Sequence, residues 1–352
     1  MKNFDYVKPA SIADAVAAAA EPGAVYLAAG TNLLDLMKGD VSRPDHLVDV
    51  TRLPGLDRIE RLPDGGLRIG ALVRNSDLAH DSQFAKSYPA IAEALLSGAS
   101  AQLRNAATVG GNLLQRTRCG YFYDTASACN KREPGTGCDA SGGENRLHAI
   151  LGWSYSCIAT HPSDFCVPLV ALDAVVEIEG KAGRREMALE ELHRLPGDTP
   201  QQETALEPGD LIVALRLPGD APAFAAHARY IKVRERTSFA FAVVSAAAAL
   251  RIEDGRIGEA RLALGGVAAK PWRARAAEAI LAGAPPGPDA FRRAAAAALA
   301  DAKPSGDNQF KIELAQRIVV RALTLAAAGT PDRMPALPAS PFSSLAGALT
   351  DA

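Results

Sequence analysis

Four of the five cysteines of this 352-residue chain fall within one short stretch, with the spacing C-x9-C-x8-C-x18-C. Such crowding indicates that the segment folds around a metal centre or prosthetic group, or is stapled by disulfide bonds. The cysteines are odd in number and stand among Gly, Asp, Asn and Arg, and the chain starts without the apolar core of a signal peptide. These features disfavour a disulfide framework. The candidate ligands are Cys119, Cys129, Cys138 and Cys157.

Length and charge limit the classes of protein to which the chain can belong. A length of 352 residues predicts two or three domains, and a hydrophobic content of 48% is enough to fill their cores. A formal net charge of -2 argues against the broad basic surface that nucleic-acid binding needs. The longest apolar run, residues 239–250, is shorter than the roughly 20 residues that span a bilayer. We therefore expect neither a nucleic-acid partner nor membrane insertion.

Hydrophobic patterning and turn signals predict a mixed chain of helices and strands. An alanine-rich helix is expected after Ser11, and a pair of antiparallel strands around the turn Asp254-Gly255. Three helices are expected to follow, beginning near Ala274, Asp289 and Asn308. The remaining expected strands are 25–29, 47–50, 66–73, 170–178, 211–217, 230–233, 240–252 and 259–267, and the remaining helices are 33–38, 76–80 and 89–97.

Two glycine-containing turns have the composition of an anion-binding site. Gly30-Thr31-Asn32 stands between a predicted strand and a predicted helix, where backbone N–H groups point outward at the positive end of the helix dipole. The second turn is Thr108-Val109-Gly110-Gly111-Asn112, and the polar segment His161-Pro162-Ser163-Asp164 follows the cysteines. Because glycine has no Cβ, a phosphate or sugar can approach its backbone closely. These segments predict a site for a ligand that carries a diphosphate.

Five short blocks of sequence occur in a fixed order along the chain. They are residues 28–32 (AAGTN), 108–112 (TVGGN), 163–164 (SD), 207–212 (EPGDLI) and 263–267 (ALGGV). In this order they resemble the FAD-binding subunits of xanthine dehydrogenase-type molybdenum hydroxylases, and the resemblance extends from Phe4 to about Ala327. Five ordered blocks are far more specific than one glycine motif.

The cysteines lie in an insertion at about 115–160. Within the family, residues 112–119 (NLLQRTRC) resemble the medium subunits of periplasmic-type aldehyde oxidoreductases. In simpler members the Gly-Gly-Asn turn is followed almost at once by the Ser-Asp pair. In the similar subunits such an insertion holds an extra [4Fe-4S] cluster, and the resemblance implies the same here. We expect the ends of the insertion to lie close together and its removal to spare the flavin site.

The resemblance implies an α+β architecture. A PCMH/VAO-type two-subdomain FAD-binding fold would be followed by a CO dehydrogenase flavoprotein-like C-terminal domain of antiparallel sheet and helices. The FAD-binding domain is expected over 1–225, with subdomains of about 1–55 and 56–225. The C-terminal domain is expected over 226–329, and a Pro-rich extended tail over 330–352.

The same resemblance implies roles for individual residues. Both glycine turns would share the diphosphate of FAD, with Asn32 and Thr108 donating to its oxygens and Asp164 accepting from a ribityl or ribose hydroxyl. Ile212 resembles an apolar contact under the flavin or adenine, and Lys232 a cation near the cofactor. From the residues alone they could also be a sheet core residue and a solvated lysine at a strand edge. The residues expected to bind FAD are Leu27, Ala28, Ala29, Gly30, Thr31, Asn32, Leu33, Thr108, Gly110, Gly111, Asn112, Asp164, Ile212 and Lys232.

The residues alone leave three interpretations of the cysteines open: a [4Fe-4S] cluster, a zinc site, or reduced or disulfide-bonded thiols. The spacing lacks the paired C-x2-C of zinc ribbons. Cys166, in an apolar setting, is expected to be a small buried residue. His148 could replace a cysteine as ligand, and His161 either caps a loop or relays protons. Four nearby cations are either solvated or offset the charge of a cluster: Arg116, Arg118, Lys131 and Arg132.

Taken together, the resemblance implies an electron-transfer flavoprotein subunit. A molybdenum-cofactor large subunit would oxidise an aldehyde or aromatic heterocycle, and a [2Fe-2S] small subunit would pass the electrons to the FAD of this chain and on to an external acceptor. The alternative from another class is a zinc-stabilised binding or assembly module without flavin. The expected compartment is the periplasm, reached by co-export with a signal-bearing partner, or alternatively the cytoplasm.

Overall fold

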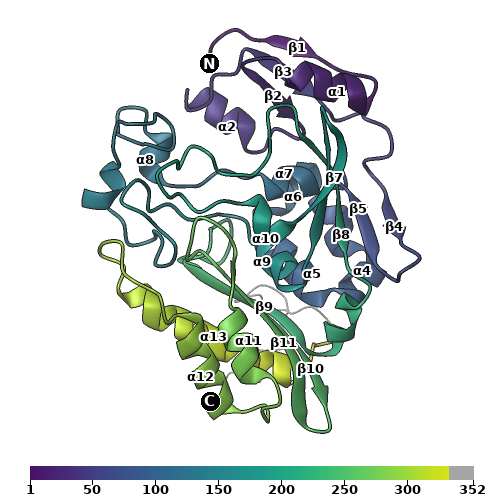
Figure 1. Cartoon of the computed structure of the whole chain (residues 1–352), viewed down its shortest axis with the longest axis vertical. Coiled ribbons are helices and arrows are strands. Elements are labelled where there is room, and N and C mark those ends of the chain that lie inside the picture. Colours follow the sequence, from purple (N-terminus) through teal and green to yellow (C-terminus); the bar gives the residue numbers. More distant parts are fainter. Residues whose placement is uncertain (333–352) are drawn as a thin grey trace.

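The computed structural model describes residues 1–332, which form three sheets flanked by helices (Figure 1). A three-stranded sheet comes first along the chain, a five-stranded sheet second and a four-stranded sheet last. In Figure 1 the first and last sheets lie at opposite ends of the molecule, with the five-stranded sheet between them. The predicted α+β architecture is confirmed.

The N-terminal part is a small parallel sheet of order β1-β3-β2. Its first helix begins where predicted, because the side chain of Ser11 accepts a hydrogen bond from the backbone N–H of Asp14 and so caps the helix. The elements are β1 (Asp5–Val7), α1 (Ile12–Ala19), β2 (Ala24–Leu27), α2 (Leu33–Lys38) and β3 (His46–Asp49).

The middle part is an antiparallel sheet of order β4-β5-β8-β6-β7, covered by short helices. The strands and helices are β4 (Ile59–Arg61), β5 (Leu67–Gly70), α3 (Asn75–His80), α4 (Ser82–Ser87), α5 (Pro89–Ser97), α6 (Ala101–Ala106), α7 (Val109–Leu113), α9 (Cys166–Ala171), β6 (Val175–Gly180), β7 (Gly183–Ala188), α10 (Leu189–Leu192), β8 (Leu211–Leu217) and η2 (Ala221–His227).

One expected strand of this part begins later than predicted. The apolar run from Val170 to Ile178 was expected to be a single strand, but it starts inside α9, and β6 begins only at Val175. Between them Asp173 takes a positive φ of 52°, which reverses the chain. Apart from Asp173 and Glu177 the run is apolar, and such a short run has no period that separates a buried helix from a buried strand, so the pattern could not locate the start of the strand.

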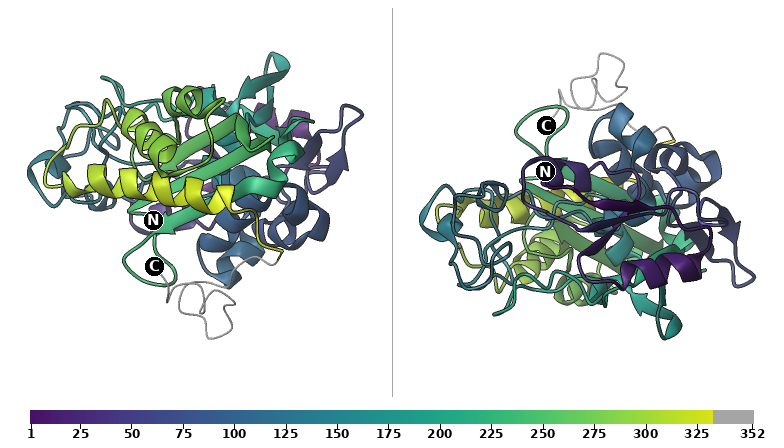
Figure 2. Two further views of the ribbon diagram at one scale, coloured as in Figure 1. Left: turned by 90° about the horizontal axis from the view of Figure 1, so that it is seen from below. Right: turned by 90° about the horizontal axis from the view of Figure 1, so that it is seen from above.

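The C-terminal part is an antiparallel sheet of order β12-β11-β10-β9. Its helices lie on one face of the sheet, and Figure 2 shows α13 running along it. The bounds are β9 (Ala228–Val233), β10 (Val244–Glu253), β11 (Arg256–Gly265), β12 (Trp272–Arg273), α11 (Arg275–Leu281), α12 (Pro288–Ala298) and α13 (Phe310–Ala327).

Strand β10 joins the two large parts because it is buried on both faces. Ala246, Ala248 and Leu250 belong to the core formed with the C-terminal helices. The alternate residues Ala247 and Ala249 belong to the core of the middle part. Successive side chains of a strand point to opposite faces, so an uninterrupted apolar run fits a strand between two layers.

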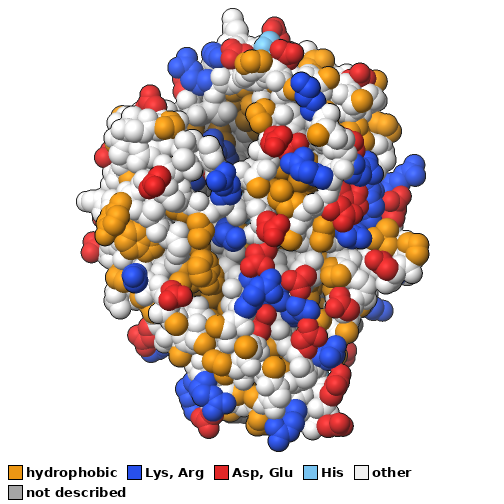
Figure 3. Space-filling view, viewed as in Figure 1, with side chains coloured by type: hydrophobic (Ala, Val, Ile, Leu, Met, Phe, Trp, Pro, Cys, Tyr) orange, Lys and Arg blue, Asp and Glu red, His pale blue; other side chains and the backbone are white. Residues whose placement is uncertain are grey.

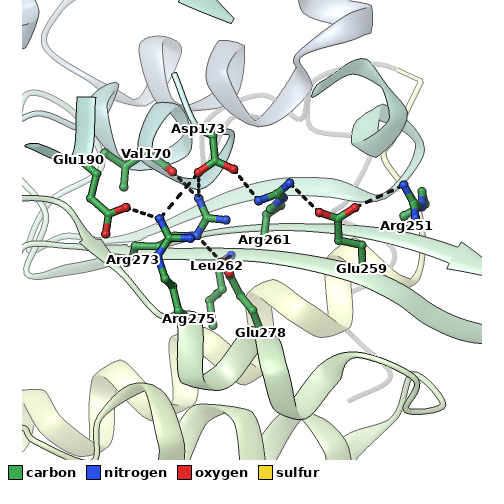
Figure 4. Close-up of polar contacts among 10 residues, drawn as sticks. All are labelled: Val170, Asp173, Glu190, Arg251, Glu259, Arg261, Leu262, Arg273, Arg275 and Glu278. Atoms are coloured by element: carbon green, nitrogen blue, oxygen red, sulfur yellow. Dashed lines mark hydrogen bonds and ion pairs between the residues drawn. The ribbon is translucent and has the colours of Figure 1, made fainter. Parts of the chain in front are cut away.

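An ion-pair network crosses the same junction (Figure 4). Asp173, which follows α9, accepts from Arg261 of β11 at 2.5 Å and from Arg273 of β12 at 3.1 Å. Arg273 also donates to the carbonyl of Val170 at 2.5 Å and pairs with Glu278 of α11. The side chain of Arg273 has no exposed surface, so this network holds a buried cation at the junction.

The insertion contains α8 (Gly120–Tyr123), η1 (Asp139–Gly142) and otherwise irregular chain, and it lies to one side of the molecule in Figure 1. Asn308 anchors the second half of the insertion by donating to the carbonyls of His148 and Ala149 at 3.1 and 3.2 Å. Within residues 1–332, no helix is both long and apolar enough to cross a bilayer. Most of the tail expected over 330–352 lies outside the described residues, which end at Asp332.

Candidate functional site

A cavity of about 800 Å³ opens between the N-terminal part, the middle part, the insertion and the loop after β9. Thr31, Gly111, Asn112 and Asp164 all line it, so the two glycine turns and the Ser-Asp segment meet in one place. Figure 3 shows the surface hollowed between the N-terminal part and the insertion, with Lys and Arg side chains in the hollow. This volume lies within the usual range for sites that bind small molecules and cofactors.

The first glycine turn is shaped by Gly30. Its φ of +72° is a backbone conformation that residues other than glycine rarely adopt. A Cβ at this position would also lie 2.8 Å from Cδ1 of Leu34. The predicted donor Asn32 is instead engaged with the insertion: its Oδ1 accepts from the N–H of Arg116 at 2.9 Å, and its Nδ2 lies 3.4 Å from the hydroxyl of Tyr123. Of the seven predicted residues of this segment, Thr31 lines the cavity.

The second glycine turn begins α7. Thr108 caps this helix by accepting from the N–H of Gly111 at 3.3 Å. Gly110 packs inward, since a Cβ there would lie 2.9 Å from Cβ of Ala71. Gly111 faces the cavity, and the only near neighbour of a Cβ there would be the Thr108 hydroxyl at 3.1 Å. The two glycines therefore have different roles. Gly110 lets α7 pack closely against Ala71, and Gly111 leaves space in the cavity because it has no side chain.

The two ends of the insertion meet at Asn112. Its Oδ1 accepts from Oγ of Ser163 at 2.8 Å and from Nε2 of Gln115 at 2.6 Å. The expectation that the ends lie close together is thus confirmed. The insertion is not a detached appendage, however, because Arg118, Cys119 and His148 line the cavity. Because residues of the insertion form part of the cavity wall, its removal would change the site, contrary to the expectation that the site would be spared.

Asp164 is buried and takes part in a polar triad. It accepts from the hydroxyl of Tyr230 at 2.5 Å and from Nζ of Lys232 at 2.7 Å. Burial, together with the Asp164 carboxylate, holds the pKa of Tyr230 well above its ordinary value. The side chain of Lys232 is only 4% exposed, so it is not a solvated strand-edge lysine. Ile212 lies in the core of the middle part, which fits the second interpretation of this residue, a sheet core residue.

The cavity is rich in cations, of which the sequence analysis singled out only Arg118. Arg104 and Arg118 each have a buried Nε without a hydrogen-bond partner in the described chain. Arg118 also lies over the ring of Phe241, with 4.9 Å between its Cζ and the ring centroid. Guanidinium groups that line an open cavity suit an anionic ligand, and the aromatic rim suits a flat ring. The cationic lining residues are Arg104, Arg118, Arg146 and Arg236.

The four clustered cysteines surround a second, much smaller cavity. Cys129 and Cys138 face each other in an antiparallel bridge, and all four thiols are free. Burial raises the pKa of Cys119 to about 11 and also raises that of Cys157. His148 places its Nε2 3.2 Å from Sγ of Cys119. The donor set therefore fits a thiophilic metal centre, with His148 beside it as a hydrogen-bonding group.

The spacing of these thiols disfavours a single zinc ion. Tetrahedral zinc thiolates with bonds of about 2.3 Å place their sulfurs about 3.8 Å apart. In the described chain, the group of potential ligands whose atoms all lie within 4.8 Å of one another contains Cys166 and none of these four. The four thiols are thus spread more widely than one zinc ion allows.

The cations around the cysteines are anchored rather than solvated. Lys131 is 6% exposed; its Nζ donates to the carbonyl of Pro200 at 2.9 Å and pairs with Glu203 at 3.1 Å. Arg132 donates to the carbonyls of Tyr121 and Phe122 at 2.8 and 2.9 Å. Positive charge is thus built into this segment.

Comparison with known proteins identifies the family. Residues 2–220 match the FAD binding domain in molybdopterin dehydrogenase, and residues 229–326 match the CO dehydrogenase flavoprotein C-terminal domain. The chain belongs to the FAD-binding subunits of molybdenum hydroxylases. It is an oxidoreductase component with an electron-transfer role, and the predicted family, fold and FAD binding are confirmed at this level. A zinc-stabilised module without flavin is not favoured.

Individual relatives cover nearly the whole chain. It is 50% identical to the aldehyde oxidoreductase FAD-binding subunit PaoB of Escherichia coli strain K12, over 93% of this chain and 99% of the relative. It is 28% identical to the carbon monoxide dehydrogenase medium chain of Hydrogenophaga pseudoflava, over 92% and 96%. A carbon monoxide dehydrogenase structure from that organism superposes with a TM-score of 0.73 at 28% identity, over 93% of this chain and 98% of that chain.

Sequence reasoning missed several residues of the site. Tyr230 and the cavity arginines Arg104, Arg146 and Arg236 belong to no block that the chain shares with the family, so no pattern indicated them. His193, which lies near His161, was not singled out either. Only the folded chain brings these side chains together.

Proposed function

We propose that this chain holds FAD in the 800 Å³ cavity as the flavin subunit of a molybdenum-containing aldehyde oxidoreductase. The observation that carries the proposal is the convergence of both glycine turns, Asp164 and four arginines on one cavity. When bound, FAD supplies the ability to take up electrons from one partner and pass them to another. The 50% identity to PaoB supports the choice of an aldehyde oxidoreductase within the family.

The residues of the chain would bind and orient the cofactor. The Gly111 face and Thr31 would admit the diphosphate, and the guanidinium groups of Arg104 and Arg118, which line the cavity, would donate to its anionic oxygens. Asp164 still has unused lone pairs, through which it would accept from a cofactor hydroxyl. Lys232 and Tyr230 hold the Asp164 carboxylate in place.

Replacing Gly111 by Val tests the site directly. The larger side chain would project into the cavity, and overpacking of about 1–3 kcal/mol corresponds to roughly 5–150-fold weaker FAD binding. FAD per chain is measured by absorbance after purification, and folding by circular dichroism. Gly287→Val is the matched control, because a Cβ at Gly287 would meet nothing within 4 Å. A folded Gly111→Val chain with full FAD would refute this assignment.

We further propose that Cys119, Cys129, Cys138 and Cys157 bind a [4Fe-4S] cluster. Support comes from four free thiols around one small cavity, spaced more widely than zinc allows, with Lys131 and Arg132 anchored nearby. Cys129→Ser should lower iron and acid-labile sulfide while leaving most of the FAD in place. Cys166→Ser, outside this set, is the control. Iron and sulfide that stay at the wild-type level in Cys129→Ser would contradict the proposal.

The proposed partners are a molybdenum-cofactor large subunit and a [2Fe-2S] small subunit, with an external electron acceptor. Support comes from relatives that are named as subunits or as a medium chain. The periplasm is proposed as the compartment. Because a thiolate cluster needs reduced cysteines, it would be assembled before export of the folded complex. Fractionation of cells tests this proposal, and recovery of the complex in the cytoplasm would reject it.

A further inference from the structure

A second group of soft ligands lies outside the cysteine-rich insertion. His161, Cys166 and His193 each offer one atom, and these atoms lie within 4.8 Å of one another. The two imidazole rings are tilted by 59°, with centroids 4.3 Å apart. His161 lies in the loop after the insertion, Cys166 opens α9, and His193 follows α10. Three separate segments thus place an N, N, S donor set at one point.

All three donor groups are buried, and the two imidazole donor atoms are also unpaired in the described chain. Nε2 of His161 and Nδ1 of His193 have no hydrogen-bond partner in the described chain, although both atoms are buried. Cys166 has no exposed surface. A buried polar atom without a partner costs about 1–3 kcal/mol, so two such atoms at one point favour a ligand between them.

The surroundings of His193 prepare it as a ligand. Its Nε2 donates to the carbonyl of Leu113 at 2.8 Å, which leaves the lone pair on Nδ1 for a metal. Nδ1 of His161 contacts the N–H of Ser163 at 3.3 Å, and this contact is the longer and weaker of the two. Binding through Nε2 of His161 moves the ring proton to Nδ1 at the expense of that contact. The ring stays neutral.

We propose that His161, Cys166 and His193 form a buried site for a soft d¹⁰ cation, Cu⁺ or Zn²⁺. Two neutral imidazoles and one thiolate are ligands that both ions accept. Charge favours Cu⁺, because Cu⁺ and a thiolate are together neutral in this buried place, whereas Zn²⁺ would leave a net charge of +1. Three ligands complete a trigonal Cu⁺ site but leave tetrahedral Zn²⁺ with a vacant position.

The electrostatic state of the three groups agrees with this assignment. Burial lowers the pKa of His193 to about 4 and that of His161 well below its ordinary value, so both rings are neutral at pH 7. Burial raises the pKa of Cys166 to about 12, so without an ion the thiol keeps its proton. Binding replaces this proton by the cation, and one proton is released to the solvent per ion bound.

The site lies behind the wall of the large cavity. Thr160, Pro162 and Asp164 line that cavity, whereas His161 and Cys166 of the same segment do not. His193 is bonded to Leu113 at the end of α7, which begins with the second glycine turn. A bound ion would therefore tie the loop carrying Asp164 to the helix carrying Gly111. The proposal does not depend on FAD or on the four clustered cysteines.

The test is metal binding by the full chain, prepared without oxygen. Cu⁺ is titrated in competition with bicinchoninate, and Zn²⁺ separately in competition with 4-(2-pyridylazo)resorcinol. Wild type should bind one equivalent more of at least one ion than Cys166→Ala and His193→Gln, with one proton released per extra ion. Gln at 193 can still donate to the Leu113 carbonyl. His80→Gln is the control, because His80 is exposed and far along the chain from the group.

Circular dichroism and FAD content check that each variant is folded. If Cys166→Ala does not fold, the site is tested by metal titration of His193→Gln and by X-ray absorption of the metal-loaded wild type. One sulfur and two imidazole nitrogens around the extra ion would support the site. Equal binding of both ions by wild type and the folded variants would overturn the proposal, as would a first shell containing sulfur alone.

Discussion

At the scale of single residues, Lys311 shows how one side chain can fix an irregular segment. Its Nζ donates to the carbonyls of Leu147, His148 and Gly266 at 2.9, 2.7 and 2.7 Å. Leu147 and His148 belong to the insertion, and Gly266 follows β11. Lys311 therefore satisfies carbonyls that would otherwise be unpaired, and it ties the insertion to the C-terminal part.

The buried ammonium of Lys311 should make stability depend on pH. Burial lowers its pKa from 10.5 to about 7. Below about pH 7 both folded and unfolded chains hold the proton; between 7 and 10.5 the unfolded chain holds more of it. This lysine therefore makes the free energy of unfolding rise with pH in that window, by at most about 1.4 kcal/mol per pH unit.

The variant Lys311→Met should be less stable than wild type, and the gap should widen from pH 7 to pH 10. Urea unfolding of both proteins at several pH values measures the difference. Lys303→Met is the control, since Lys303 is exposed to solvent. A gap that stays constant across the window would show that Lys311 is not the titrating group.

At the scale of elements, the junction between α9, β11, β12 and α11 depends on Arg273 (Figure 4). Its side chain is fully buried, and Glu278 beside it is 13% exposed. Glu278 also accepts from the backbone N–H of Leu262 at 2.7 Å. A buried cation that loses one of its counter-ions costs far more than a broken surface pair.

Glu278→Gln keeps the shape and an acceptor oxygen but removes the charge. We expect a loss of about 2–4 kcal/mol in the free energy of unfolding, less than a fully broken buried pair because Asp173 still faces Arg273. Glu313→Gln is the matched control, because the Arg317–Glu313 pair is exposed on α13 and should cost less than about 1 kcal/mol. Denaturant unfolding of both variants measures these losses. Equal losses in the free energy of unfolding would rule out a special role for the buried network.

At the scale of the whole molecule, the proposed function requires partners. Isolated chain loaded with FAD should be reduced by dithionite, yet an aldehyde should leave its flavin absorbance unchanged. The physical reason is that the large cavity would be filled by the cofactor, and aldehyde oxidation is assigned to the large subunit. Adding the proposed large and small subunits should restore bleaching by aldehyde. Bleaching of the isolated chain by aldehyde would contradict this division of labour.

The sequence by itself determined the family, the order of the two matched domains and the places of the two glycine turns. These features are local: Gly30 requires a positive φ, Ser11 caps α1, and the uninterrupted apolar run in β10 fits a strand between two layers. Each can be read within a few residues, because backbone conformation and side-chain period depend on near neighbours.

The tertiary structure alone decided what each residue does in the site. It turned Gly110 toward Ala71 and Gly111 toward the cavity, and it engaged Asn32 with the insertion. It also brought His193 to His161 across 32 residues of sequence. Such contacts join residues far apart along the chain, and their partners are set by how sheets and loops pack. No spacing or composition in the sequence specifies them, because the energy that selects them arises only when the layers come together.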